Sequence, residues 1–241
     1  MLLRGLTKHV KDQNWFAVAL DFFIVVFGIL IAFQITNWSD ARSERIDAGN
    51  ILVRLEQDFQ QKLDRTDRSL ALYKSNLAAA GRLIRGIRQK QLAEETLLDD
   101  ISIATEYTLP TGPSITYTEL VSDGRLQLIQ SDELRRALSE LNDYVNFARG
   151  QHGFYTSPLD SSRGTLISAR SLIATGVPVK KNRNSFATKE VDHARLINDP
   201  DMLAALQTAY GIQDNLHAIL LDNRQSILGI LDLIKVEQKK R

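Results

Sequence analysis

The residues best suited to chemistry in this chain are its histidines and a cluster of acidic side chains. The four histidines are His9, His152, His193 and His217. A helical metal site needs several histidine or carboxylate ligands at spacings of three or four residues, and Asp214 lies three residues before His217. One such pair is typical of a surface hydrogen bond. We therefore predict that the histidines bind no metal.

The acidic cluster favours a solvated helix surface over a cation site. Its members are Glu94, Glu95, Asp99 and Asp100. Calcium sites usually take carboxylate ligands from a loop with a glycine at its turn, whereas these residues lie among helix-forming side chains. The chain also has no cysteine, no Gly-x-Ser-x-Gly motif and no glycine-rich phosphate loop. We therefore predict a protein that is not an enzyme and holds no cofactor.

Other side chains bear on binding. A net charge of +1 gives no overall electrostatic drive toward nucleic acid. The short basic stretch Lys180–Arg183 could contact anionic lipid or nucleic acid, but three charges without interleaved aromatic residues are more typical of a solvated loop. Five further polar and aromatic side chains could line a binding groove, and packing in the core or at its rim is the alternative role for them. These candidates are Tyr117, Asp123, Tyr144, Arg149 and Tyr155.

An apolar run near the start of the chain indicates that these side chains belong to a membrane-anchored protein. It extends from Trp15 to Trp38 with Asp21 as its charged residue. At about 1.5 Å per residue it spans roughly 36 Å, enough to cross a hydrocarbon core of about 30 Å, and tryptophan favours both membrane interfaces. We therefore predict a tail at 1–14, a transmembrane helix at 15–38 anchored by its two tryptophans, and a helical domain at 39–241.

Charge predicts the orientation of this helix. Arg4, Lys8 and Lys11 precede the apolar run, and positive charges in short segments stay in the cytoplasm. We expect a bacterial inner-membrane protein that crosses once, with a cytoplasmic N-terminus and a periplasmic main domain. A cleaved signal peptide is the alternative, because Ser39 and Ala41 suit a signal peptidase. The length of the apolar run argues against cleavage.

One face of the transmembrane helix carries small residues. Ala17, Asp21, Gly28 and Ala32 share this face, and Gly28 with Ala32 forms a small-xxx-small pattern. Such patterns let two membrane helices approach closely. The face predicts self-association, and a lone anchor with an incidental glycine is the alternative.

The anchor also resembles that of a known family. Asp21, the core Val25–Ala32 and the exit Gln34–Trp38 match an acidic-VVxGILIA-Gln-x-x-Asn-Trp pattern. This pattern resembles the anchor of a family of bacterial single-pass membrane proteins with a domain of unknown function. Thr116–Leu138 and Leu196–Pro200 resemble later stretches of that family. The resemblance implies an anchored helical architecture and no catalytic residue.

Two long helices are expected to organise the main domain. Apolar residues recur at steps of three and four from Leu52 to Ile87, and again from Leu206 to Ile234. This spacing places a narrow apolar stripe on each helix, as in a coiled coil. The sequence therefore predicts an all-α fold in which helices 40–91 and 200–235 pair antiparallel. The shorter helices complete a bundle of about four to six helices.

Capping residues and breakers predict the shorter elements. We expect a helix at 93–107. A second helix should begin at a capping box of Thr116 and Glu119 and stop at Gly124. A third should begin at an N-cap at Ser131 and turn Leu134, Leu138, Leu141 and Val145 inward. We also expect a break at 109–113, a helix at 158–174 closed by 176–178, an exposed loop at 180–189, and a final helix opened by Asp199 and Pro200.

Two functions are compatible with this organisation. The first is a membrane-anchored interaction or scaffold module that associates with the lipid bilayer and with a second copy or another membrane protein. The second is a periplasmic ligand-sensing module, which would signal through a membrane partner because the tail before the anchor is short. A pocket lined by Arg149 or by tyrosines would favour the second, and a closed apolar core would oppose it.

Overall fold

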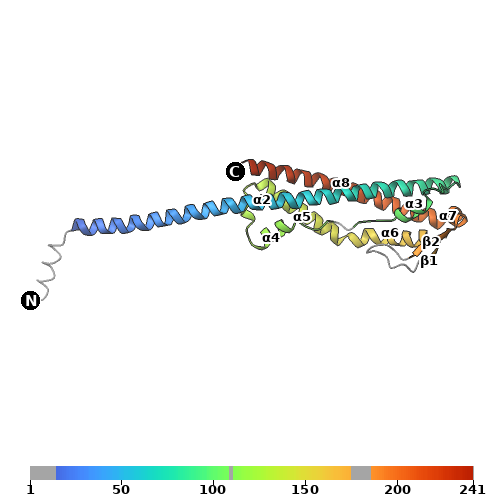
Figure 1. Ribbon diagram of the computed structural model, residues 1–241, viewed down its shortest axis with the longest axis horizontal. Helices are drawn as coiled ribbons and strands as arrows, with labels where there is room; N and C mark the ends of the chain where they lie inside the picture. The colour runs from blue at the N-terminus through green and yellow to red at the C-terminus, as the bar shows by residue number, and fades with distance from the viewer. Residues whose placement is uncertain (1–14, 109–110, 175–185, 241) are drawn as a thin grey trace, which may run out of the picture. The chain divides into compact units, whose positions relative to one another are not determined.

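The computed structural model describes residues 15–108, 111–174 and 186–240, and most of them are helical (Figure 1). The longest element, α2, covers Trp15–Gln89. The chain divides into two compact units between Asn50 and Ile51, within α2, and each unit is described by itself. The prediction of an all-α fold with a long N-terminal helix is confirmed, with one small sheet as an exception.

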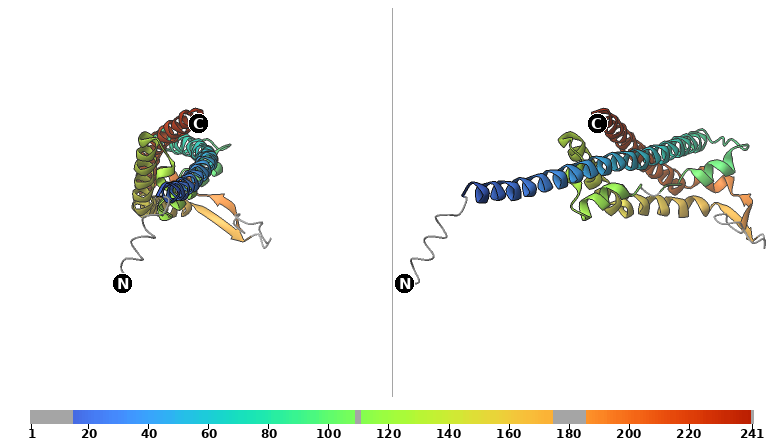
Figure 2. Two further views of the ribbon diagram at one scale, coloured as in Figure 1. Left: turned by 90° about the vertical axis from the view of Figure 1, so that its left-hand side faces the viewer. Right: turned by 60° about the vertical axis from the view of Figure 1, so that its left-hand side comes forward.

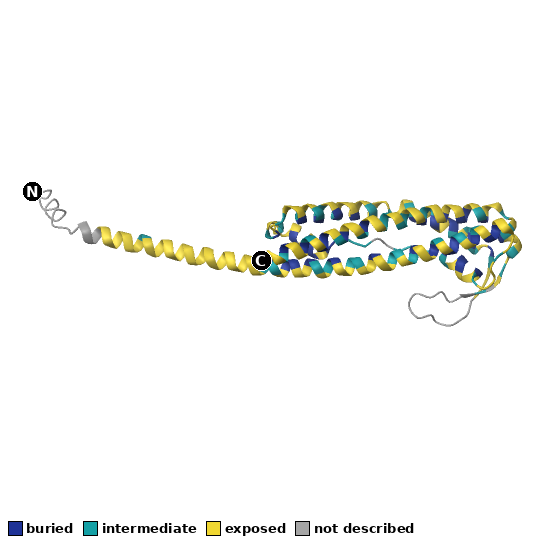
Figure 3. Cartoon of the chain, turned by 90° about the horizontal axis from the view of Figure 1, so that it is seen from above, coloured by how far each residue is buried: buried dark blue, intermediate teal, exposed yellow. Residues whose placement is uncertain are grey.

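The first unit contains the apolar part of α2. This helix is long and apolar enough to cross a membrane. Figure 3 shows the stretch as exposed along nearly its whole length. The large apolar side chains that it exposes are Leu20, Phe22, Phe23, Ile24, Val25, Phe27, Ile29, Leu30, Ile31, Phe33, Ile35 and Trp38.

The second unit is built on the remainder of α2 and on α8, Pro200–Lys239. Asp199 caps α8 by accepting a hydrogen bond from the backbone N–H of Asp201, and Pro200 occupies the first turn. Two side-chain hydrogen bonds join the helices, from Arg224 to Asp67 at 2.6 Å and from Gln238 to Glu56 at 2.9 Å. Residue numbers rise along one helix as they fall along the other, so the predicted antiparallel pair is confirmed. Coiled-coil packing of the pair stays a prediction.

Shorter elements complete the second unit (Figures 1 and 2). Ser131 caps α5 by accepting from the N–H of Leu134 at 3.1 Å, and the inward side of α5 is the predicted one. Gly124, at φ +66°, ends α4 in the left-handed conformation that favours glycine. The elements are α3 Leu97–Ile103, α4 Ile115–Ser122, the 3₁₀ turn η1 Leu126–Leu128, α5 Asp132–Gly150, α6 His152–Ile167 and α7 His193–Asn198.

Two predicted helix starts are wrong. The helix expected at 93–107 is reduced to α3, because 94–96 form a turn and the helix stops at Ile103. The expected cap Thr116 lies inside α4 and is buried, whereas Ser114 caps the helix by accepting from the N–H of Tyr117 at 3.2 Å. Ser114 fits the role because its backbone is extended there.

The helix expected at 158–174 is also wrong. Helix α6 begins earlier, at His152, tolerates Pro158 in its interior, and ends at Ile167. Strand β1, Arg170–Ala174, follows and pairs antiparallel with β2, Phe186–Val191. The strands extend outward from the end of α6 (Figure 2). The expected exposed loop is therefore wrong at residues 186–189, and the rest of it, the stop at 176–178 and Leu109–Pro110 lie outside the described residues.

The core of the bundle consists of two apolar clusters at opposite ends of the α2–α8 pair. Neither cluster draws a described residue from the middle layer, which we define as α2 residues 64–78 and α8 residues 207–226. Cluster one is Ile51, Leu52, Leu55, Phe59, Tyr117, Leu120, Ile129, Leu134, Leu138, Leu141, Val145, Ile227, Ile230, Leu231 and Ile234. Cluster two is Ala79, Ala80, Leu83, Ile87, Leu97, Ile101, Ala104, Leu166, Ala169, Leu196, Met202 and Leu206.

Candidate functional site

The predicted association face of the apolar helix is exposed in the first unit. Asp21, Gly28 and Ala32 are all exposed, and a Cβ added at Gly28 would meet no atom within 4 Å. Trp38 is 65% exposed, and the guanidinium carbon of Arg42 lies 5.7 Å from the centre of its ring. The side chains of Trp15 and Ala17 lie outside the described residues. Helix association and interface anchoring by these residues stay predictions.

In the second unit, the middle layer buries polar atoms that the protein leaves unpaired. Each of four side chains has one buried oxygen without a hydrogen-bond partner among the described residues. A buried polar atom without a partner costs stability unless water or a ligand reaches it. The four are Thr66 Oγ1, Asn76 Oδ1, Gln213 Oε1 and Asn223 Oδ1.

The amide nitrogens of two of these side chains hold the chain after α3. Gln213 donates to the carbonyl oxygens of Ala104 and Glu106 at 2.8 and 3.2 Å. Asn76 donates to the same Glu106 carbonyl at 2.7 Å. The N–H of Thr108 donates to the Tyr73 hydroxyl at 3.4 Å. The middle layer thus holds the connection between α3 and α4 by polar contacts.

A cavity of about 170 Å³ opens beside this layer. Tyr73 of α2, Tyr144 of α5 and Tyr155 of α6 contribute to its wall, so we call it the tyrosine cavity. Helix α8 supplies the aliphatic part of the wall. The lining residues are Tyr73, Thr108, Tyr144, Phe147, Ala148, Gln151, His152, Tyr155, Leu216, Ile219 and Leu220.

The wall of the tyrosine cavity is mainly apolar, with hydroxyl, amide and imidazole groups as its polar part. Burial raises the pKa of the Tyr73 phenol. Burial, with a smaller effect from the Asp222 carboxylate, also raises the pKa of Tyr144. Both phenols therefore stay neutral at physiological pH. None of the described lining residues is an aspartate, glutamate, lysine or arginine.

Contacts outside the tyrosine cavity hold His152, one of its lining residues, in place. The Tyr107 and His152 rings meet edge to face with centroids 5.8 Å apart. The Tyr107 hydroxyl donates to the Asp160 carboxylate at 3.3 Å, and the Arg163 guanidinium carbon lies 6.0 Å from the Tyr107 ring centre. These contacts tie the start of α6 to the connection that the middle layer fixes.

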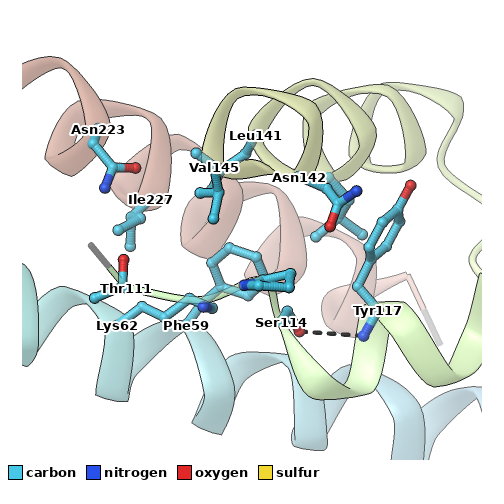
Figure 4. A pocket seen from close by; sticks show the side chains of 12 residues that line it. Phe59, Lys62, Thr111, Ser114, Tyr117, Leu141, Asn142, Val145, Asn223 and Ile227 are labelled. Carbon is cyan, nitrogen blue, oxygen red and sulfur yellow. Dashed lines mark hydrogen bonds between the residues drawn. The ribbon is translucent and has the colours of Figure 1, made fainter. Parts of the chain in front are cut away.

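Two further hollows lie along α5 and α8. An open groove of about 480 Å³ shares Tyr144 with the tyrosine cavity and also contains Asn223. Asn223 also lines a space of about 10 Å³, where Leu141, Val145 and Ile227 gather near Phe59 (Figure 4). A space of this size holds about one water molecule. The tyrosine cavity is therefore a better candidate for a small molecule than this space.

The small space is closed by charged and capping groups. Burial lowers the pKa of Lys62, which donates to the carbonyl of Gly112. Burial opposes the charged form of Asp58, but hydrogen bonds from Thr116 N–H and Ser114 Oγ, both at 2.9 Å, outweigh it and lower the pKa of Asp58. These contacts join α2 to the start of α4 and act structurally.

The structure places some of the candidates named from the sequence in the cavities and others on the surface. Tyr144 and Tyr155 line the tyrosine cavity, whereas Tyr117 lines the small space. Asp123 and Arg149 are exposed and line neither. Sequence reasoning missed Tyr73, Phe147 and His152. Tyr73 carried a signal, because it lies on the predicted inward stripe of α2.

Comparison with protein families gives a match to a family of unknown function, DUF6090, over residues 21–164. The matched stretch begins at the aspartate of the apolar helix and ends within α6. It includes the Tyr73, Tyr144 and Tyr155 positions of the cavity. No curated protein and no solved structure matches the chain.

Proposed function

The chain belongs to the family of unknown function DUF6090, and from its helices we propose that it is a membrane-anchored interaction or scaffold module, not an enzyme. The observation that carries the proposal is the contrast in exposure along α2. Residues 19–46 are almost entirely exposed and mostly apolar up to Trp38, whereas the later part of α2 buries its apolar stripe in the bundle. A bilayer would cover the first part.

We place the protein in the bacterial inner membrane, crossing once, with its bundle in the periplasm. Arg4, Lys8 and Lys11 support a cytoplasmic N-terminus. Protease treatment of intact spheroplasts should digest the bundle, and alkaline carbonate should leave the chain in the membrane. Protection of the bundle would reverse the orientation. A mature chain that lacks its first forty or so residues would identify a cleaved signal peptide instead.

We further propose that the anchor self-associates through Gly28 and Ala32. Both are exposed, and the space around Gly28 is free for a second helix. Asp21 shares this face and would gain a partner there, which matters because an unpaired charge in a membrane is costly. A second copy of the chain is the simplest partner that presents the same face.

Disulfide crosslinking tests the association. The chain has no cysteine, so Ser39→Cys introduces a single thiol, eleven residues from Gly28 and on nearly the same helix face. We expect a crosslinked dimer that Gly28→Leu largely abolishes. Ala19→Leu is the matched control, because Ala19 lies on the opposite face, and it should leave the dimer intact. Equal crosslinking in both variants would overturn the proposal.

A second candidate function is ligand sensing, and the tyrosine cavity favours it. A pocket lined by tyrosines was expected to favour sensing, and the bundle has an aromatic cavity of this kind beside an incompletely paired polar layer. Small-molecule sites are typically concave and mostly apolar, with few polar groups that fix orientation. A sensor of this kind would pass its signal through the anchor to a second copy or another membrane protein.

A further inference from the structure

We infer that the tyrosine cavity binds an uncharged, single-ring aromatic molecule that carries one small polar substituent such as a hydroxyl group. This inference rests on the sensing alternative proposed above and names its ligand class. Three properties of the wall lead to it: its size, its chemistry and its position in the bundle.

Size limits the ligand to about one ring. The cavity measures about 170 Å³. An apolar cavity of about 150 Å³ in another protein accommodates benzene. The tyrosine cavity therefore fits a benzene-sized ring with a small substituent, and a fused polycyclic compound would not fit without movement of the wall.

The chemistry of the wall selects an aromatic ring with a neutral polar group. Tyr73, Tyr144, Tyr155 and Phe147 present aromatic surfaces, and aromatic pairs gain from edge-to-face or offset contact beyond simple burial. Leu216 and its neighbours on α8 supply aliphatic surface. Phenol hydroxyls, with Gln151 and Thr108, offer neutral hydrogen-bond groups to a hydroxyl substituent.

Charge on the ligand is disfavoured. The described wall provides no carboxylate, ammonium or guanidinium group, so an ionised ligand would lose its hydration with at most the imidazole of His152 as a charged neighbour in the wall. Such a loss is far more costly than the burial of a neutral hydroxyl that finds a hydrogen bond. Benzoate and benzylammonium should therefore bind much more weakly than phenol.

The position of the cavity gives binding a structural effect. Tyr73, Leu216, Ile219 and Leu220 belong to the middle layer, where neither apolar cluster reaches. A ring bound there would supply packing contacts that the ends of the bundle already have. Phe147 is 66% exposed and Tyr144 37% exposed, which marks their side as the entrance.

Fluorine NMR of the full chain in lipid nanodiscs tests the inference. The chain has six tyrosines, so uniform labelling with 3-fluorotyrosine gives six resonances, assignable by single Tyr→Phe replacements. Phenol should shift the resonances of Tyr73, Tyr144 and Tyr155 in a saturable manner. Tyr117 and Tyr210 lie outside the cavity wall and serve as internal controls. We expect phenol to bind at least about tenfold more tightly than benzoate or benzylammonium.

Variants locate the site. Ala148→Leu adds volume at the cavity wall and should abolish the shifts caused by phenol. Ala218→Leu makes the same change at an exposed position of α8 outside the wall and should leave binding intact. The six-resonance spectrum itself shows whether each variant is folded. Retained binding in Ala148→Leu would overturn the assignment of the site.

The outcomes separate the ligand class from the functions proposed above. Equal or tighter binding of the charged rings would overturn the ligand class and leave sensing in place. If none of the three compounds caused a saturable shift, both the proposed ligand class and the assignment of the tyrosine cavity as its binding site would be overturned. Neither result affects the scaffold proposal, because crosslinking through Ser39→Cys tests that proposal without a ligand.

Discussion

The two ends of the bundle and its middle layer use the same pair of helices in different ways. At the ends, α2 and α8 bury apolar side chains. Buried carboxylates there accept hydrogen bonds: Asp100 accepts two from Arg82 and one from Thr96, and Glu237 accepts one from the backbone N–H of Gln130 at 3.2 Å. In the middle layer, Thr66 and Asn223 bury oxygens without partners among the described residues.

The ends of the helix pair therefore hold most of its clustered apolar surface, and the middle layer holds unpaired polar atoms beside a cavity. Apolar contacts at the ends hold the helices together with little dependence on orientation. A layer with unpaired polar atoms and a cavity lowers stability, and proteins often accept such a cost at functional sites.

The largest effect is expected from a cavity made in cluster two. Leu206→Ala removes a fully buried side chain and should lower the free energy of unfolding by about 2–5 kcal/mol. Leu221→Ala is the matched control on α8, because Leu221 is 47% exposed, and it should change stability by less than about 1 kcal/mol. Urea unfolding of the full chain in detergent micelles measures both. If Leu206→Ala and Leu221→Ala lowered the free energy of unfolding equally, the buried and exposed positions of α8 would not differ in their contribution to stability.

A smaller loss is expected when the buried charge at this end loses its partner. Arg82→Met leaves the Asp100 carboxylate, which is 2% exposed, with Thr96 alone. We expect a loss of about 1–3 kcal/mol in the same urea assay. Arg54→Met breaks the exposed ion pair with Glu119 and should cost less than about 1 kcal/mol. An Arg82→Met loss no greater than this control would contradict the pairing argument.

At the other end, Asp58 should make stability depend on pH. Its hydrogen bonds lower its pKa in the folded state, so its contribution is present above the unfolded pKa of about 3.9 and is lost as the pH falls through the folded value. Asp58→Asn should lower the free energy of unfolding at pH 7 by about 1 kcal/mol, and the difference from the unchanged protein should shrink at pH 3. Asp232→Asn, at an exposed position of α8, is the control. A constant difference at both pH values would refute the link.

Sequence patterns predicted the elements that depend on local signals. The Ser131 cap and the four-residue and three-residue steps from Leu134 to Val145 were enough for α5. Asp199 and Pro200 were enough for the start of α8. An apolar stretch long enough to cross a membrane is itself a local signal, and it identified the first part of α2.

The sheet and the cavity could not be predicted in the same way. Ile173 continues the helical spacing of Leu159 and Leu166, but the strand Arg170–Ala174 depends on pairing with Phe186–Val191, a contact that no local pattern contains. The tyrosine cavity assembles side chains from α2, α5, α6 and α8. Tyr144 and Tyr155 were identifiable as candidates, yet only tertiary packing places Tyr73 beside them.

The smallest expected effect has the opposite sign and tests the middle layer directly. Thr66 is fully buried, and its hydroxyl has no partner among the described residues. Thr66→Val keeps the shape of the side chain and removes the unpaired hydroxyl, so it should raise the free energy of unfolding by up to about 1 kcal/mol. Thr105→Val is the matched control, because Thr105 is also buried but its hydroxyl accepts from Arg163 at 3.4 Å, and it should destabilise by a similar amount. If both variants lost stability equally, the Thr66 hydroxyl would be paired, by a water molecule, and the middle layer would not differ from the ends in polar satisfaction.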